Sequence, residues 1–585
     1  MLRTSKRELN ADEVCRLMDE YFNEARISLL FLRRIKSIDF RIHEETNFSW
    51  SVIRKRPLDE DAKSFSELLI CSFAKTVEAS TLITGKDHWW VAIEDLLPHA
   101  GRLPHSMRRV MKNIECGIAA LISSKSDTNR GIIAPEAIQS RMFSTLPLPM
   151  SSELPIHIHA TFSLSGDRQS ISIAEDGPEA HGSEWNRYLL EDALPNLYLA
   201  FLDDIGTQVR QRVFSFWPPG QTPKGSVSEL LCTSFWKKLP QSSRRLFPKA
   251  EPNTGLPQRR AAELFDINQA VFDFLPQNHS EVLTPLLMSL EVKLVRNIPA
   301  EVAKNLKTFP EVKSVTGQLL RRLLKSEGAK TYLLKEIGKN PQILEVLFSR
   351  VIPAGTDLED LDGCHLLPLA GGGLATLKYV NASMATSPTS YYVVSEKELQ
   401  LFQFASRYLV LSTTARKLES VINSAKFNVG KLQLYDLRKL LELKPSSLTP
   451  NPEGDKWLGE FWEFWNKHTD SSLPWLTVDD LNIPIFRARR SGVDSYATPV
   501  QFHEYPAVVE PSVIQHQKLC DKIPGLYQFD PKFMPTSLRD SEVSFVRNVS
   551  FYKFVRAMRK LAGPTWTKNF VEAHLDVAQV KVLFL

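Results

Sequence analysis

The sequence contains little cysteine, and its cysteines are not arranged in pairs. Six cysteines occur among 585 residues, all far apart and none in a C-x-x-C spacing. This pattern excludes a disulfide-stapled domain and a cysteine-based zinc site. The polar start MLRTSKREL does not resemble a secretory leader. We therefore expect a reducing compartment, either cytoplasmic or nuclear.

Long apolar runs and an excess of charge of one sign are also missing. No run reaches the roughly 18 apolar residues that a membrane-spanning helix needs, so we expect no membrane partner. Lys and Arg total 72 against 67 Asp and Glu, which leaves a net charge of +5. Such a weak field does not favour nucleic acid as a partner.

The common catalytic motifs are absent as well. The sequence has no G-x-S-x-G, no H-E-x-x-H, no G-x-G-x-x-G and no G-x-x-x-x-G-K-[ST]. These absences exclude the usual serine hydrolases, zinc peptidases, dinucleotide-binding enzymes and P-loop ATPases. We expect neither an enzyme nor a cofactor-binding protein of these classes.

The patterns that are present predict an α/β to α+β fold. A helix is predicted from Asn10, its N-cap, to near Arg33, and a helical stretch at 65–80. Short apolar runs typical of strands occur at 35–42, 48–53, 89–93, 118–122, 142–148 and 156–164. Together they predict a mixed or antiparallel sheet with helices on one side.

We predict four regions along the chain. They are an α/β region at 1–217, a Pro-, Ser- and base-rich linker at 218–260, a helical connector at 261–350 and an α+β region at 351–585. The linker contains a helix at 226–239, opened by the capping box of Ser226 and Glu229. In the connector we expect helices near 261–275, 281–295, 312–326 and 329–348.

The last region is expected to carry two hairpins and a core helix. The hairpins turn at Gly371-Gly372-Gly373 and at Ser491-Gly492, where glycine suits a tight turn. Four aromatic residues recur at helical spacing and predict packed core: Trp457, Phe461, Phe464 and Trp465.

The histidines of ELPIHIHATFSL are the first candidates for chemistry. Ile156 and Ile158 alternate with His157 and His159, so the pattern predicts a half-buried strand whose histidines face solvent or another surface. A zinc site would need further ligands, and the spacing of the nearby Glu153, Asp167 and His181 does not bring them together. We favour the plain strand and expect no metal; a metal-dependent enzyme around the two histidines is the alternative.

Six stretches taken in order resemble a known family. They are ARISLLFLRRIKSIDFRI (25–42), MFSTLPLPMSSELPIHIHATFSLSGDRQSI (142–171), SEWNRYLLEDALPNLYLAFL (183–202), LLPLAGGGLATL (366–377), YYVVSEKELQLF (391–402) and IPGLYQFDPKFMPTSL (523–538). As a set they resemble the large repeats of sacsin and of sacsin-like fungal proteins. In that family a repeat begins with an ATP-binding domain similar to that of the ninety-kilodalton heat-shock chaperones, followed by an α/β segment like the chaperone middle domain.

The resemblance covers the part of the repeat that follows the ATP site. It implies a middle-domain-like N-terminal region, with the nucleotide domain expected before Met1. An Asp-x-Gly-x-Gly turn, which the family's ATP site needs, is absent, since Asp204-Ile205-Gly206 lacks the second glycine. The LAGGGLATL turn also departs from the family's usual Asp-Gly. Arg168 and Trp185-Asn186 match positions of the family's pattern. The resemblance implies that Arg168 contacts phosphate or a lid in a complete chain; the alternative is an ion pair with Asp167. Trp185 is expected in the core.

The function implied is that of a chaperone-type protein-interaction module, non-catalytic and possessing no nucleotide-binding domain of its own. Its partner would be a client protein, with a separate or lost ATPase domain. The alternatives are the enzyme with an unrecognised site considered above and a non-functional remnant.

Overall fold

The computed structural model describes most of the chain in two compact units. They are Met1–Thr316 (unit 1) and Gly317–Leu585 (unit 2). The described residues are 11–41, 48–55, 64–77, 81–102, 114–123, 138–173, 180–220, 222–251, 263–352, 358–380, 389–443, 451–468, 484–490, 492–498, 507–509 and 526–533. The finer division into four regions stays a prediction.

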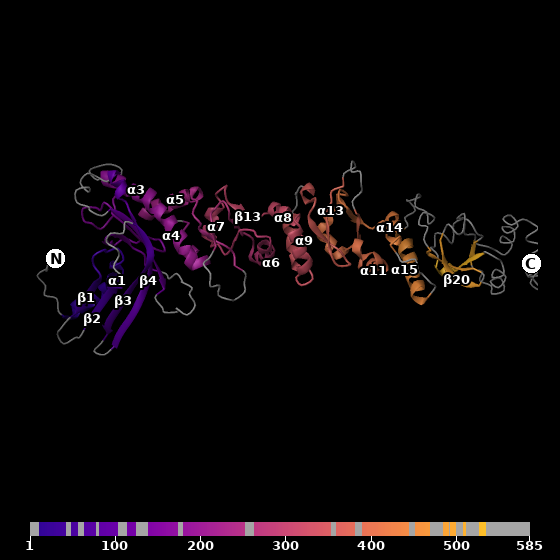
Figure 1. Cartoon of the computed structure of the whole chain (residues 1–585), viewed down its shortest axis with the longest axis horizontal. Helices are drawn as coiled ribbons and strands as arrows, with labels where there is room; N and C mark the ends of the chain where they lie inside the picture. Colours follow the sequence, from indigo (N-terminus) through magenta and orange to yellow (C-terminus); the bar gives the residue numbers. More distant parts are fainter. Residues whose placement is uncertain are drawn as a thin grey trace, which may run out of the picture. The chain divides into compact units, whose positions relative to one another are not determined.

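Unit 1 is built on an eight-stranded sheet with the order β1-β2-β3-β4-β5-β8-β6-β7 (Figure 1). The strands are β1 (Ser37–Arg41), β2 (Ser49–Arg54), β3 (Phe65–Val77), β4 (Thr81–Asp95), β5 (Glu115–Ser123), β6 (Met142–Ser144), β7 (Leu146–Pro147) and β8 (His157–Ala160). All neighbours are antiparallel except β6 and β8, which are parallel. The predicted mixed sheet, and with it the α+β fold class, is confirmed.

The prediction of a helix at 65–80 is wrong, because this stretch forms most of β3. Leu69 and Cys71 alternate with half-exposed neighbours and are buried against the sheet's helical cover. Their period of two residues is that of a strand. β3 pairs along its whole length with β4, so the two long strands form one extended hairpin.

Helices cover both faces of this sheet, not one. Ile118 and Ala120 of β5 enter a core that includes α4 (Leu194–Val209) and α5 (Val227–Lys238). Ala119 of the same strand points the other way, into a second core with Leu30 and Phe31 that follow α1 (Ala11–Ser28). Figure 1 shows α1 against β1–β4, while α4 and α5 lie side by side.

The first helix ends at Ser28 rather than near Arg33, because a buried arginine turns the chain. The guanidinium of Arg54 donates to the carbonyls of Leu29, Leu32 and Arg33. Carbonyls held by a side chain are not available for continued helical hydrogen bonds. The predicted N-cap Asn10 lies outside the described residues.

Polar contacts link α3 (Ala180–Tyr188) to the segment after β8. Trp185 is fully buried, as expected, and its Nε1 donates to the carbonyl of Thr161 at 2.7 Å. Asn186 accepts from the Ser163 N–H at 2.8 Å and donates to two carbonyls.

The predicted N-cap of α5 is confirmed, since the Ser226 hydroxyl accepts from the Glu229 N–H.

The predicted helix near 261–275 is also wrong. This stretch forms β10 (Leu264–Phe265), paired with β9 (Phe247–Pro248), and β11 (Val271–Phe272), which lies between β12 (Leu294–Val295) and β13 (Lys313–Ser314). Asp266 explains the difference, because its carboxylate accepts from the N–H groups of Asn268 and Gln269 and forms a turn. The helices of this part are α6 (Gln277–Ser289) and α7 (Ala300–Leu306).

Unit 2 begins with three helices and continues with small sheets. The helices are α8 (Gly317–Leu324), α9 (Glu327–Glu336) and α10 (Gln342–Val351), so the predicted helix at 329–348 is two helices. Pro341 at the N-cap of α10 accounts for the break. The glycine hairpin is confirmed as β14 (His365–Pro368) and β15 (Leu374–Thr376), and the second hairpin as β19 (Phe486–Arg490) and β20 (Val493–Ala497).

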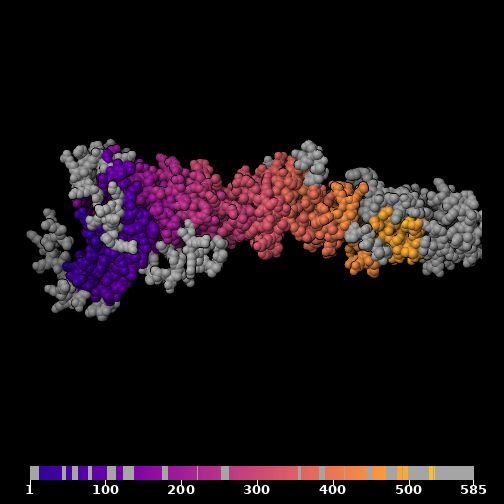
Figure 2. Space-filling view, in the orientation of Figure 1, coloured from indigo at the N-terminus to yellow at the C-terminus, as the bar shows by residue number. Residues whose placement is uncertain are grey.

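A parallel sheet lies between these hairpins along the chain. β16 (Tyr391–Val394) is its central strand, flanked by β17 (Leu409–Leu411) and β18 (Val429–Lys431). The connections contain α11 (Glu396–Leu401), α12 (Ser412–Ala415) and α13 (Glu419–Asn423), and α14 (Leu437–Leu441) follows β18. The described surface of this part is coloured orange in Figure 2.

The aromatic helix is α15 (Pro452–His468), and its predicted role in the core is confirmed. Phe461, Phe464 and Trp465 are buried in one cluster with β16 and β19, and Trp457 packs against that cluster. β19 also pairs with β22 (Tyr527–Phe529), which in turn pairs with β21 (Ala507–Val509).

Substitution of one glycine in β5 tests the two-sided packing. A Cβ on Gly117 would lie 2.9 Å from Cε1 of Phe31 and 3.3 Å from Cγ1 of Ile93. We expect Gly117→Ala to destabilise unit 1 by about 1–3 kcal/mol, through overpacking. Urea unfolding followed by circular dichroism measures this change.

The matched control is Gly459→Ala in α15, where no atom lies within 4 Å of the added Cβ. It should stabilise unit 2 by about 0.5–1 kcal/mol, since alanine is the better helix former. A Gly117→Ala protein as stable as the wild type would contradict the packing described for β5.

Candidate functional site

Both histidines of β8 point into the protein, which corrects the prediction that they face solvent or another surface. His157 and His159 are each 1% exposed, and all four residues of β8 are buried. Ile158 and Ala160 face the core of α4 and α5, while the histidines face the second core, beneath the chain that follows α1. Burial on both faces is why the alternation failed as a guide to exposure.

His157 is a neutral histidine in an aromatic pocket. Its ring centroid lies 5.2 Å from that of Trp89 and 5.3 Å from that of Phe143. Nδ1 accepts from the Arg141 N–H at 3.0 Å, so Nε2 carries the proton, and Nε2 has no hydrogen-bond partner among the described residues. Burial lowers the pKa of His157 to about 3.

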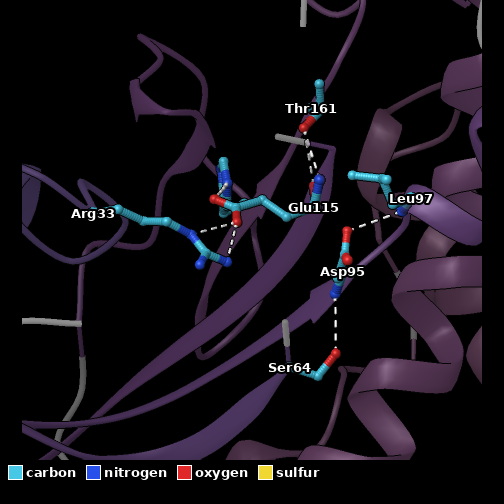
Figure 3. A network of polar contacts seen from close by, with 7 residues as sticks. Arg33, Ser64, Asp95, Leu97, Glu115 and Thr161 are labelled. Atoms are coloured by element: carbon cyan, nitrogen blue, oxygen red, sulfur yellow. Dashed lines mark hydrogen bonds and ion pairs between the residues drawn. The ribbon is translucent and has the colours of Figure 1, made fainter. Parts of the chain in front are cut away.

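His159 belongs to a buried ionic cluster with Glu115 and Arg33. Nε2 of His159 lies 3.4 Å from Oε1 of Glu115, while Arg33 donates to Oε2 through Nε at 2.9 Å and Nη2 at 2.6 Å. Figure 3 shows the guanidinium directed at this carboxylate, with Thr161 beside the Glu115 backbone. Phe31 stacks on the imidazole at 4.7 Å.

The electrostatics of the cluster favour an ionised carboxylate. Burial acts to raise the pKa of Glu115, but the hydrogen bonds and charges of His159 and Arg33 outweigh it and lower that pKa. Glu115 is further anchored through its main chain, because its N–H donates to Thr161 Oγ1 at 3.0 Å and its carbonyl accepts from the Thr161 N–H at 2.9 Å.

This arrangement stabilises the fold and does not present a reactive group to a ligand. A carboxylate–imidazole pair is typical of a general base, but here Nδ1 of His159 faces the Thr145 N–H and Nε2 faces Glu115. No group of three His, Cys, Asp or Glu that could hold a metal ion occurs in the described part of the chain. Burial also raises the pKa of the Cys71 and Cys232 thiols to about 12, which disfavours a nucleophilic thiolate.

The other residues named from the sequence are not brought to this cluster. Glu153 and Asp167 are exposed, and the side chain of His181 lies outside the described part of α3. Arg168 is exposed, with a positive φ of 59°, at the tip of the hairpin closed by Leu164 and Ile171. Its contact with phosphate or a lid stays a prediction.

Unit 2 contains an open cavity of about 530 Å³ that the sequence did not reveal. Its walls come from the start of β16, the end of α13, strand β18 and the segment 433–439. Tyr435 is 56% exposed in this wall, and Lys431 and Lys439 are exposed beside it.

A buried acid and a tyrosine form the inner part of this cavity. Burial raises the pKa of Asp436, although the Gln433 N–H and the Tyr392 hydroxyl both donate to its carboxylate and oppose this. Burial and Asp436 likewise raise the pKa of Tyr392. The tyrosines of YYVV and the lysines after them are visible in the sequence. Their position around one cavity, however, depends on the parallel pairing of β16 and β18.

One curated protein, human sacsin, is similar to this chain. The two are 22% identical over 384 residues, a match that covers 62% of this chain and 8% of sacsin. The chain therefore spans less than a tenth of that relative's length. No protein-family profile and no solved structure matches the chain. These findings support a distant sacsin-like relationship.

The ion pair of Arg33 and Glu115 should be important for the stability of unit 1. Arg33→Met removes two hydrogen bonds to a carboxylate whose side chain is only 10% exposed. We expect a loss of about 3 kcal/mol in urea unfolding, because one charge of a buried pair is left behind.

The double variant Arg33→Met/Glu115→Leu should recover most of this loss, since neither charge is then buried. The control is Lys249→Met, which breaks the exposed pair with Glu263 and should cost about 1 kcal/mol or less. An Arg33→Met cost no larger than that of the control would contradict the assignment.

His157 should make unit 1 less stable as the pH falls. Its folded pKa of about 3 is below the ordinary histidine value of 6.5, so protons bind preferentially to the unfolded chain below pH 6.5. Stability is fully present above pH 6.5 and falls by up to about 1.4 kcal/mol per pH unit towards pH 3. Glu115 begins to contribute only below its unfolded pKa of about 4.3, so measurements between pH 6.5 and 5 separate His157 from Glu115. Burial raises the pKa values of Glu94 and Asp203, so the His157 variant is needed to assign the slope.

The variant His157→Asn keeps an acceptor for the Arg141 N–H and should flatten the pH dependence of the unfolding free energy in this range. The exposed His99 supplies the control, His99→Asn, which should leave the slope unchanged. A wild-type slope in His157→Asn would show that another group causes the effect.

Proposed function

We propose that this chain is a chaperone-type protein-interaction module of the sacsin-like kind, which holds a client or partner protein without turning over ATP itself. The observation that carries the proposal is the similarity to human sacsin over 384 residues. The motif resemblance in the sequence extends to the sacsin-like proteins of fungi. A role in the cytoplasm or nucleus agrees with the free cysteines at 15, 71, 116, 232 and 364.

The polar groups of the described residues support binding rather than catalysis. The ionic cluster of unit 1 is closed and internally satisfied, whereas the cavity of unit 2 is open and lies beside a strand. Strand edges and adjacent grooves are common sites for peptide segments.

No described helix is long and apolar enough to cross a membrane.

The position of Asp204 and Gly206 also argues against ATP turnover by these residues. Both lie within α4, not in a loop, and Gly206 packs 3.1 Å from Leu264, measured from an added Cβ. A turn that approaches adenine cannot form inside a helix. In this proposal the ATPase domain is separate or lost.

The alternative of a metal-dependent enzyme around His157 and His159 has little support in the geometry. Nδ1 of each imidazole accepts a backbone N–H, and both rings are buried among aromatic side chains. Phe31, in the chain after α1, stacks on His159, while Trp89 and Phe143 pack against His157.

The purified chain should suppress the aggregation of a heat-denatured test enzyme, measured by light scattering, at near-stoichiometric ratios. We expect the suppression to be the same with and without magnesium and ATP, because no nucleotide is needed for holding. Bovine serum albumin at equal concentration is the control.

Magnesium-dependent ATP hydrolysis well above a no-enzyme control would contradict the proposed function. Absence of suppression by a soluble, cooperatively melting chain would also contradict it. A chain that itself aggregates would favour the non-functional remnant, since such a fragment exposes apolar surface.

A further inference from the structure

We propose that the outer edge of β18 binds an extended, acidic segment of a partner protein by strand addition. The inference rests on the proposed function and names the surface and the kind of partner. It is carried by three features of unit 2: the direction of the β18 backbone groups, the cavity around that strand, and the charges that flank it.

The backbone of β18 presents hydrogen-bonding groups on its outer side. On the inner side Tyr391 donates to the carbonyl of Asn428, and Leu432 donates to the carbonyl of Val393. In a parallel ladder this pattern turns the N–H and C=O groups of Val429 and Lys431 away from β16. Neither residue has a backbone partner on that side among the described residues.

The cavity gives an added strand room beside this edge. Its lining includes Val429, Gly430 and Lys431 themselves, with Ala425, which follows α13, and Tyr435 from the segment after β18. A volume of about 530 Å³ accommodates several side chains of an extended peptide. Because alternate side chains of a strand point to opposite faces, an added strand would place every second residue in the cavity.

The charges at the edge favour an acidic occupant. Lys431 and Lys439 line the cavity, and no ion pair joins either of them to another described residue. Asp436 is the acid in this lining, and it is engaged by the Gln433 N–H and the Tyr392 hydroxyl. The charge of Lys439 also acts on Asp436. Carboxylates of the partner would therefore meet Lys431, with Lys439 shared between the partner and Asp436, which gives both steering and selectivity.

The test measures binding of designed peptides to the full chain by fluorescence anisotropy. The first probe is a labelled peptide of about twelve residues that alternates valine and glutamate, a length that spans a short edge strand. The second replaces glutamate by lysine. The third keeps glutamate but carries N-methyl groups on alternate backbone amides, which removes the hydrogen bonds of a strand while keeping its charge.

We expect the glutamate peptide to bind at least about tenfold more tightly than either of the other two, a difference of about 1.4 kcal/mol. Lys431→Glu/Lys439→Glu should weaken its binding by a similar factor. Lys431→Pro should also weaken it, because it removes an outward N–H but no hydrogen bond to β16. The matched control is Lys335→Glu, a charge reversal of an exposed lysine in α9, which should bind like the wild type.

Circular dichroism and thermal melts establish that each variant is folded, and only folded variants are compared. Equal binding of the glutamate and N-methylated peptides would overturn strand addition, since charge alone would then explain the affinity. Equal binding by the wild type and the double lysine variant would show that the acidic segment does not bind at β18.

The aggregation assay separates this inference from the proposed function. A chain that suppresses aggregation but does not bind the glutamate peptide would overturn the β18 site and leave the interaction role standing. A chain that binds the peptide through β18 but suppresses no aggregation would support the site and contradict the role in holding unfolded clients.

Discussion

Burial of the central strands from both sides is the constraint on which the rest of unit 1 depends. β5 and β8 send alternate side chains into two cores, one beneath α4 and α5 and the other beneath the chain that follows α1. The second core contains charge, and the Arg33–Glu115 pair supplies the compensation that a buried carboxylate requires. Arg54 completes the arrangement by holding the carbonyls of the same turn. The N-terminal segment is thus fixed by polar contacts as much as by apolar burial.

This constraint also decides what the histidines do. Two imidazoles separated by one residue would be ligand candidates on an open sheet face, but under a helical layer each is used to satisfy a backbone N–H. His157 stays neutral between aromatic rings, and His159 contributes to the environment of Glu115. The polar contacts of both histidines therefore stabilise the fold. An open cavity with exposed polar groups lies elsewhere, around β18.

The contrast between the two parts of the chain supports the proposed binding role. A rigid, doubly covered sheet resists deformation, whereas a short parallel sheet with an incompletely paired outer strand offers backbone groups to another chain. The distant similarity to human sacsin covers 62% of this chain but 8% of sacsin. Interaction through a strand edge requires no nucleotide site close by.

The sequence alone determined the elements whose signals are local. The Ser226 cap, the glycine hairpin at 371–373 and the aromatic face of α15 each depend on neighbours within a few residues, and each was predicted correctly. Tertiary structure decided the rest: β3 is a strand because β4 pairs with it, α1 stops at Ser28 because Arg54 takes the next carbonyls, and His157 is buried because a second layer covers its face. The cavity at β18 likewise depends on pairing between strands that are far apart in the sequence. The physical reason is that the exposure and strand pairing of a segment depend on the segments that pack against it. The periodicity of its own sequence carries no information about those partners.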